Sequence, residues 1–96
     1  MRLLMIVYDA AFEQEVMAVL EKGGPVGYTK WSRVLGQGER SEPRLDQAVW
    51  PGYNQVVMTV LPQERAQALA GELADLRQEE RAVGLSVYAL PVEQLV

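Results

Sequence analysis

Two kinds of hydrophobic pattern alternate along this chain, and their order constrains its fold more than any other feature. Residues 2–8 form a nearly continuous apolar run that ends at Asp9, which is typical of a buried strand. Asp9 suits the cap of a following helix. The apolar residues of this helix recur at helical spacing, and Glu13 is expected to face water; the apolar residues are Phe12, Val16, Val19 and Leu20. Residues 22–25 end this helix, because glycine closes a helix in the left-handed conformation and proline cannot continue it.

The same order of patterns recurs from residue 27 onward. Residues 27–35 mix aromatic and β-branched residues with polar ones, as half-exposed strands do, and residues 55–61 predict a third strand. Pro62 suits the first position of a second helix, whose apolar stripe consists of Ala66, Leu69, Ala70, Leu73 and Leu76. Gly84 ends that helix, and residues 85–90 predict the last strand.

The predicted order is therefore strand, helix, strand, strand, helix, strand. Right-handed crossovers within each half bring the strands into one four-stranded antiparallel sheet with two helices on one face. This arrangement is an α+β fold, a ferredoxin-like βαββαβ sandwich. The 96 residues suffice for one such core, so we expect a single domain over residues 1–96.

The sheet face opposite the helices needs a partner. The strands contain more apolar residues than the helix-covered face can bury, and we assign to the uncovered face Leu4, Ile6, Tyr8, Val57, Thr59, Leu61, Tyr88 and Leu90. We therefore expect a homo-oligomer in which these faces pack together. The chain has no cysteine, so no disulfide supplements a small core.

Composition excludes several classes of function. A net charge of -4 argues against nucleic acid as the main partner. The apolar run at residues 2–8 is too short for a signal peptide or a membrane span, so we expect a cytoplasmic protein without membrane insertion. Without histidine or cysteine, the chain builds neither a Ser-His-Asp nor a Cys-His catalytic centre, and no thiolate or imidazole metal site. We predict no catalytic residue and no enzyme activity. An enzyme of this fold, for instance a dimeric monooxygenase-like barrel, would need a polar residue between sheet and helices, and none stands out.

Residues 36–52 are the leading candidate site. Structureless connections longer than about 12 to 15 residues are usually functional or disordered. Gly36, Gln37 and Gly38 follow the second strand directly, where backbone N–H groups could approach an anion such as phosphate, although two glycines there more often form a turn or bulge. Four basic residues form a local cationic patch around this segment: Lys30, Arg33, Arg40 and Arg44. A local patch in an acidic protein favours a small anionic ligand over a polyanion.

The same loop carries further candidate side chains. Glu39, Glu42 and Asp46 could bind a hard cation, but their spacing matches no known ligand loop and loop carboxylates usually face water. Trp31 and Trp50 flank the loop and either stack on a base or pack against each other. The sequence predicts no metal ligand and identifies no cofactor.

Two segments resemble the PII signalling proteins. Residues 29–38 (Thr-Lys-Trp-Ser-Arg-Val-Leu-Gly-Gln-Gly) are similar to the second strand and the base of the T-loop in that family, and residues 86–95 are similar to its last strand. The whole chain can be laid along the family in order, and it looks most like a divergent PII-like branch. The resemblance implies a trimer with ligand clefts between subunits, ATP or ADP near Gly36, Gln37 and Gly38, and a mobile T-loop that contacts target proteins.

Two departures from the PII pattern concern the nucleotide. The family's B-loop, which carries a phosphate-binding lysine before the last strand, is reduced here to residues 81–84, and the C-terminal arginines are missing. We therefore predict a PII-like trimeric regulatory protein that binds a nucleotide or similar small anion at subunit clefts, with the ligand residues Gly36, Gln37, Gly38, Arg40, Lys30 and Arg33. Its loop is predicted to modulate an unknown partner protein through Glu42, Arg44, Asp46 and Trp50. The alternative is a CutA-like or efflux-associated metal-responsive protein that uses the loop carboxylates.

Overall fold

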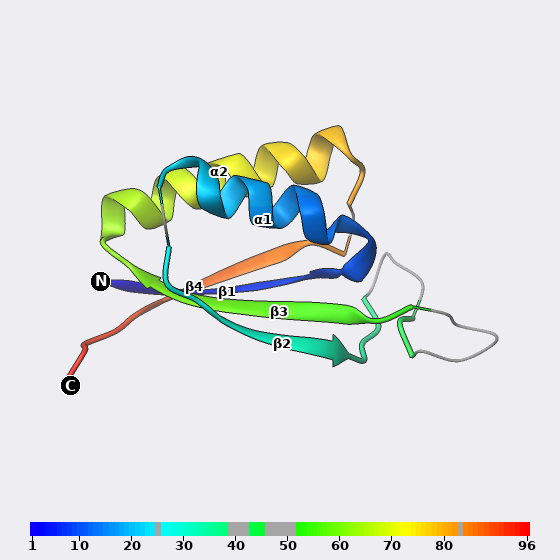
Figure 1. The fold of residues 1–96 in the computed structure, drawn as a ribbon, viewed down its shortest axis with the longest axis horizontal. Helices are drawn as coiled ribbons and strands as arrows, with labels where there is room; N and C mark the ends of the chain where they lie inside the picture. The colour runs from blue at the N-terminus through cyan, green and yellow to red at the C-terminus, as the bar shows by residue number, and fades with distance from the viewer. Residues whose placement is uncertain (25, 39–42, 46–51, 83) are drawn as a thin grey trace.

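The expected elements appear in the computed structural model, which describes residues 1–24, 26–38, 43–45, 52–82 and 84–96. Their order is β1 (Arg2–Asp9), a short 3-10 helix η1 (Ala10–Phe12), α1 (Glu13–Lys22), β2 (Thr29–Val34), β3 (Asn54–Leu61), α2 (Gln63–Glu79) and β4 (Ser86–Pro91). Both helices lie on one face of the sheet (Figure 1). The ferredoxin-like α+β fold is thus confirmed. Within the described ranges, no helix is long and apolar enough to cross a membrane.

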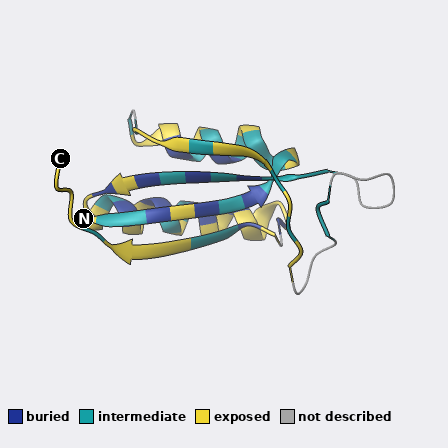
Figure 2. Cartoon of the chain, turned by 90° about the horizontal axis from the view of Figure 1, so that it is seen from below, coloured by how far each residue is buried: buried dark blue, intermediate teal, exposed yellow. Residues whose placement is uncertain are grey.

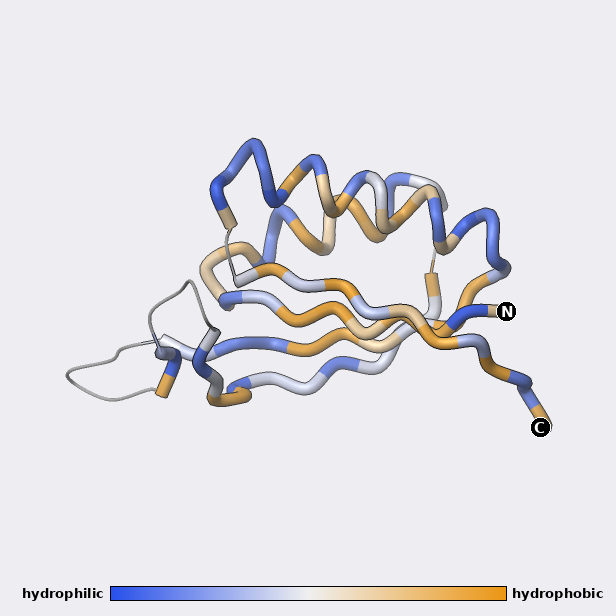
Figure 3. Tube along the Cα trace, turned by 180° about the vertical axis from the view of Figure 1, so that it is seen from behind, coloured by the Kyte–Doolittle hydropathy of each residue, from blue (hydrophilic) through white to orange (hydrophobic). Residues whose placement is uncertain are grey.

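The sheet places its most apolar strands at the centre. The strand order is β2-β3-β1-β4, and each neighbouring pair is antiparallel. β1 and β3 carry nearly continuous hydrophobic residues, whereas the edge strand β2 is mostly polar, as the hydropathy colours in Figure 3 show. A polar edge strand protects unpaired backbone groups from pairing with another chain.

The core lies between the sheet and the two helices. On β1, Leu4, Ile6 and Tyr8 point toward the helices and are at most 1% exposed. The helices cover them with one buried stripe each, formed by Val16 and Leu20 of α1 and by Ala66, Leu69, Leu73 and Leu76 of α2. Both stripes have the spacing of an amphipathic helix, so the sequence pattern located the helix faces correctly.

The sheet has an uncovered apolar face, as predicted, but most of the residues predicted for it lie on the other face. The residues that lie under the helices instead are Leu4, Ile6, Tyr8, Val57, Thr59 and Leu61. The uncovered surface, called the open face below, consists of Leu3, Met5, Val7, Val56, Met58, Val60, Tyr88 and Leu90. In the register, Met5 lies opposite both Met58 and Tyr88, and Tyr88 is 60% exposed.

The open face is visible in Figure 2, where exposed and intermediate residues alternate with buried ones along β1 and β3. Residues 2–8 are apolar at both alternating sets of positions, so the pattern alone does not say which set faces the helices. Only the packing of α1 and α2 decides it.

Three connections gather at one end of the sheet (Figure 1). They are the turn from β1 into η1, the described residues 35–38, 43–45 and 52–53 between β2 and β3, and the described residues 80–82 and 84–85 between α2 and β4. Both chain termini lie at the opposite end, where the Val92 N–H donates to the Met1 carbonyl at 3.2 Å.

Candidate ligand site at the base of the long loop

The long connection between β2 and β3 leaves the sheet through a short paired stem. The Gly36 N–H donates to the Arg44 carbonyl at 2.8 Å, and the Arg44 N–H donates to the Gly36 carbonyl at 2.6 Å. The sequence predicted Gly36 as a ligand residue and Arg44 as a partner-loop residue. The structure pairs the two at the base of the loop.

Gly36 occupies a position where a side chain does not fit without movement. A Cβ atom there would lie 3.0 Å from Nδ2 of Asn54. The Gly36 N–H is already used by the Arg44 carbonyl, so it is not directed at a ligand. Gln37 and Gly38, which follow Gly36 along the chain, are exposed.

The Arg44 side chain ties the stem to the end of β1. Its Nε donates to Oδ2 of Asp9 at 2.6 Å, and the two side chains are 26% and 20% exposed. Oδ1 of Asp9 accepts the Ala11 N–H at 2.9 Å and so caps η1. The Ala10 N–H donates to the Tyr53 carbonyl at 3.0 Å. The contacts of Asp9, Ala10, Gly36, Arg44 and Tyr53 form what is called the loop-base junction below.

Arg33 lies next to this junction in a rare backbone conformation. A β-bulge interrupts the pairing of β2 with β3 between Trp31 and Val34, and Arg33 has a φ of 58°. A positive φ is costly for a residue with a Cβ and is often found at functional sites. The Arg33 guanidinium carbon lies 4.8 Å from the centre of the Tyr53 ring, which is a cation–π contact.

Lys30 does not join these arginines. It lies opposite Val57 on the helix-facing side of β2, and its ammonium binds Oε2 of Glu13 at 2.5 Å. The predicted cationic patch is therefore divided among the described residues: Lys30 contacts α1, Arg44 contacts Asp9 and Arg33 stacks on Tyr53.

Several predicted site residues lie outside the described residues. They are the ligand residue Arg40, the partner-loop residues Glu42, Asp46 and Trp50, and the carboxylate Glu39. In the described part of the chain, no group of three or more potential ligand side chains is placed to hold a metal ion.

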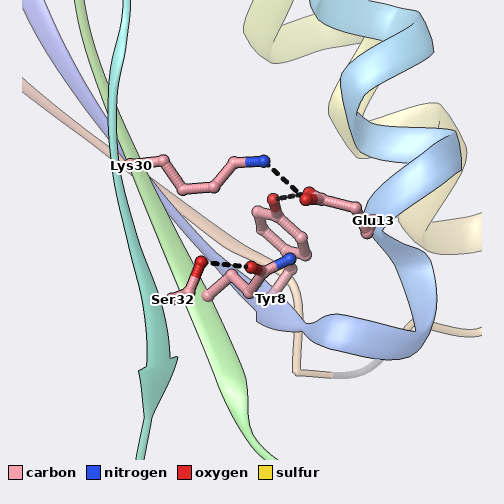
Figure 4. A network of polar contacts seen from close by, with 5 residues as sticks. Tyr8, Glu13, Lys30 and Ser32 are labelled. Atoms are coloured by element: carbon pink, nitrogen blue, oxygen red, sulfur yellow. Dashed lines mark hydrogen bonds and ion pairs between the residues drawn. The ribbon is translucent and has the colours of Figure 1, made fainter.

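A polar cluster between the sheet and α1 was missed by the sequence analysis, which expected Glu13 to face water. Figure 4 shows its side chains converging from β1, α1, β2 and β3. The Tyr8 hydroxyl donates to Oε1 of Glu13, Lys30 binds the other carboxylate oxygen, and the Ser32 hydroxyl donates to Oε1 of Gln55 at 2.9 Å. The sequence did carry one signal, because Glu13 precedes Val16 and Leu20 by three and seven residues and so shares their buried face.

The cluster shifts the acidity of two groups. Burial raises the pKa of Glu13, but hydrogen bonds from Lys30, Tyr8 and Gln55 and the charge of Lys30 outweigh it, so the Glu13 pKa lies below its ordinary value. Burial, and secondly the Glu13 carboxylate, raises the pKa of Tyr8 above its ordinary range. Glu13 is therefore ionised and Tyr8 neutral at pH 7. Both Glu13 oxygens have donors, and the Lys30 contact joins α1 to the edge strand β2.

Comparison with solved structures supports the fold assignment. The apo form of CPII from Thiomonas intermedia K12, a nitrogen regulatory PII-like protein, has a TM-score of 0.64 and 16% identity, with 93% of this chain and 85% of CPII covered. CPII bound to ADP and bicarbonate gives a TM-score of 0.64 and 19% identity, with 97% and 88% covered. A protein assigned as PII-like and signalling, from Thermus thermophilus, gives 0.58 and 25% identity, with 93% and 81% covered.

Sequence comparisons address the family directly. The search of curated proteins found no significant match. The family model described as nitrogen regulatory protein P-II matches residues 1–96. The resemblance carried by the second strand, the loop base and the last strand is therefore confirmed, and this chain belongs to the nitrogen regulatory protein P-II family.

Proposed function

We propose that this chain, as a single domain over residues 1–96, forms a homotrimeric regulator that binds a small anionic ligand at subunit clefts. The ligand alters how the loop of residues 36–52 contacts a partner protein. The protein acts by binding and not by catalysis. A solved structure supports the class of ligand, because CPII is bound there to ADP and bicarbonate, both of which are anions.

The observation that carries this proposal is the loop-base junction. Through Arg44 and Asp9 it ties the stem of the long loop to the end of β1. Arg33 stacks on Tyr53 of the junction, and Gln37 and Gly38 follow Gly36 along the chain. A ligand bound there would contact both the folded domain and the loop. Such a ligand can change the conformation of the loop, because it binds one loop conformation more tightly than another.

The proposed ligand residues play different parts. Gln37 and Gly38 offer backbone N–H groups, Gly36 lets the stem approach Asn54 closely, and Arg33 and Arg40 supply charge. Lys30 can contribute its charge only by leaving Glu13. Glu42, Arg44, Asp46 and Trp50 form the proposed partner-contacting loop.

The open face supports the proposed trimer. Its apolar side chains include Met5 and Leu90, which are 37% and 58% exposed. Helices cover only the opposite side of the sheet, so assembly through the open face would bury a continuous apolar surface that a monomer leaves in water (Figure 2).

Native mass spectrometry and calorimetry of the purified chain test the proposal together. We expect a trimer that binds ADP, bicarbonate or both. Replacement of Arg33 by alanine should weaken binding about tenfold, because a charge-assisted hydrogen bond is lost. Arg77→Ala removes the same charge from the exposed surface of α2 and should leave binding unchanged. A monomeric mass, or no binding of either anion, would refute the proposal.

A further inference from the structure

We propose that Asp9 is a built-in competitor of the anionic ligand. In the structure its carboxylate holds the Arg44 guanidinium, and on binding the ligand's anionic group takes the place of that carboxylate. The inference rests on the proposed function and names two residues, Asp9 and Arg44, that set the ligand affinity of the loop-base junction.

The two oxygens of Asp9 have separate tasks. Oδ1 accepts the Ala11 N–H and caps η1, whereas Oδ2 accepts Nε of Arg44 at 2.6 Å. Loss of the second contact leaves the first in place, so Asp9 can release Arg44 while the turn from β1 into η1 stays capped. An aspartate that served only as a helix cap would need no arginine on its other oxygen.

The backbone of Arg44 keeps its side chain at the base of the loop. Both of its backbone polar groups pair with Gly36, so a change of partner involves the side chain and not the stem. The Arg44 Cδ passes 3.4 Å from the position that a Cβ on Gly52 would take. Gly52, at a φ of 91°, therefore lies beside the arginine and, because it has no Cβ, leaves room for the arginine side chain.

The ion pair is weak enough to be exchanged. Its side chains are 26% and 20% exposed, so water screens their attraction. Carboxylate, bicarbonate and phosphate oxygens all offer the guanidinium the acceptor geometry that Asp9 now provides. The charge of Asp9 also repels an approaching anion, so the residue lowers affinity in two ways. Exchange would couple ligand binding to the contact between the loop stem and β1.

Calorimetry with ADP and with sodium bicarbonate tests this inference on the intact chain. Asp9→Asn keeps an oxygen that can cap η1 but removes the charge, and we expect it to tighten binding about three- to tenfold. Arg44→Gln should weaken binding, and in that background Asp9→Asn should tighten binding less than it does in the wild type, because only the direct repulsion between Asp9 and the anion is left to remove. Asp75→Asn, at an exposed position on α2, changes the net charge equally and should leave affinity unchanged.

The outcomes separate this inference from the proposed function. If the wild-type chain binds ADP or bicarbonate and Asp9→Asn binds no more tightly, Asp9 is not a competitor, although the regulatory proposal stands. If neither protein binds either anion, both proposals are wrong. Binding by Asp9→Asn alone would support both. A thermal melt of each variant identifies any loss of affinity that comes from unfolding.

Discussion

At the scale of single residues, Glu13 shows how a tertiary contact overrides a surface assignment. It accepts from Tyr8 and Lys30, whose sequence positions lie on different strands. We expect Glu13→Gln to lower the free energy of unfolding at pH 7 by about 1 to 2 kcal/mol, because the amide leaves Lys30 without a counter-charge at a partly exposed site. Urea denaturation measures the change, and Glu79→Gln, exposed on α2, is the matched control.

The same variant gives a prediction for pH dependence. The folded pKa of Glu13 lies below its ordinary value of 4.5, so ionisation stabilises the folded state at pH values above 4.5. This contribution is lost as pH falls from 4.5 through the lower folded pKa. The stability difference between wild type and Glu13→Gln should therefore shrink in acid. A constant difference from about pH 7 down to about pH 3 would show that Glu13 does not act through its charge.

At the residue level, chain order was sufficient to single out Gly36 and Arg44 within one loop, because they are only eight positions apart. Their roles as a ligand residue and a partner-loop residue stay predictions. The Asp9–Arg44 and Glu13–Lys30 pairs join residues from separate elements, and their formation depends on sheet order. A single sequence carries no direct signal for such pairs.

At the scale of elements, the sequence placed α1, α2 and the four strands of the described chain, but neither η1 nor all the ends. Asp9 caps η1 and not α1, so a 3-10 turn precedes the first helix. Pro62 has a ψ of 150° and stands just before α2 instead of forming its first residue. β2 is shorter than residues 27–35 and contains the bulge at Arg33. These details depend on the local path of the backbone, which propensities do not specify.

Gly52 tests how strongly the backbone entering β3 is constrained. Its φ of 91° lies in the left-handed region, and an added Cβ would meet the Arg44 side chain at 3.4 Å. We expect Gly52→Ala to lower the free energy of unfolding by about 1 to 2 kcal/mol because alanine is strained there. At Gly27 an added Cβ would have nothing within 4 Å and no positive φ occurs, so Gly27→Ala is the control and should change stability by less than about 0.5 kcal/mol. Equal effects of the two substitutions would contradict the importance of the Gly52 conformation.

At the scale of the whole molecule, the open face decides whether the chain functions alone. Met5 lies at its centre, between Met58 on β3 and Tyr88 on β4. We expect Met5→Glu to dissociate the proposed trimer into monomers at micromolar concentration, because assembly would bury a carboxylate without a counter-charge. Native mass spectrometry measures the mass, and Ala18→Glu, at an exposed position of α1, adds the same charge outside the open face.

Circular dichroism of Met5→Glu and of the wild type distinguishes loss of assembly from loss of folding. Met5 is on the side of β1 away from the core, so the monomeric variant should keep the helix and strand content of the wild type. Its ligand binding should fall as well, because a cleft between subunits exists only in the oligomer. A Met5→Glu trimer would show that some other surface holds the subunits together. A monomer with unchanged ADP or bicarbonate affinity would move the ligand site into one chain, where the loop-base junction would have to form it without a neighbour.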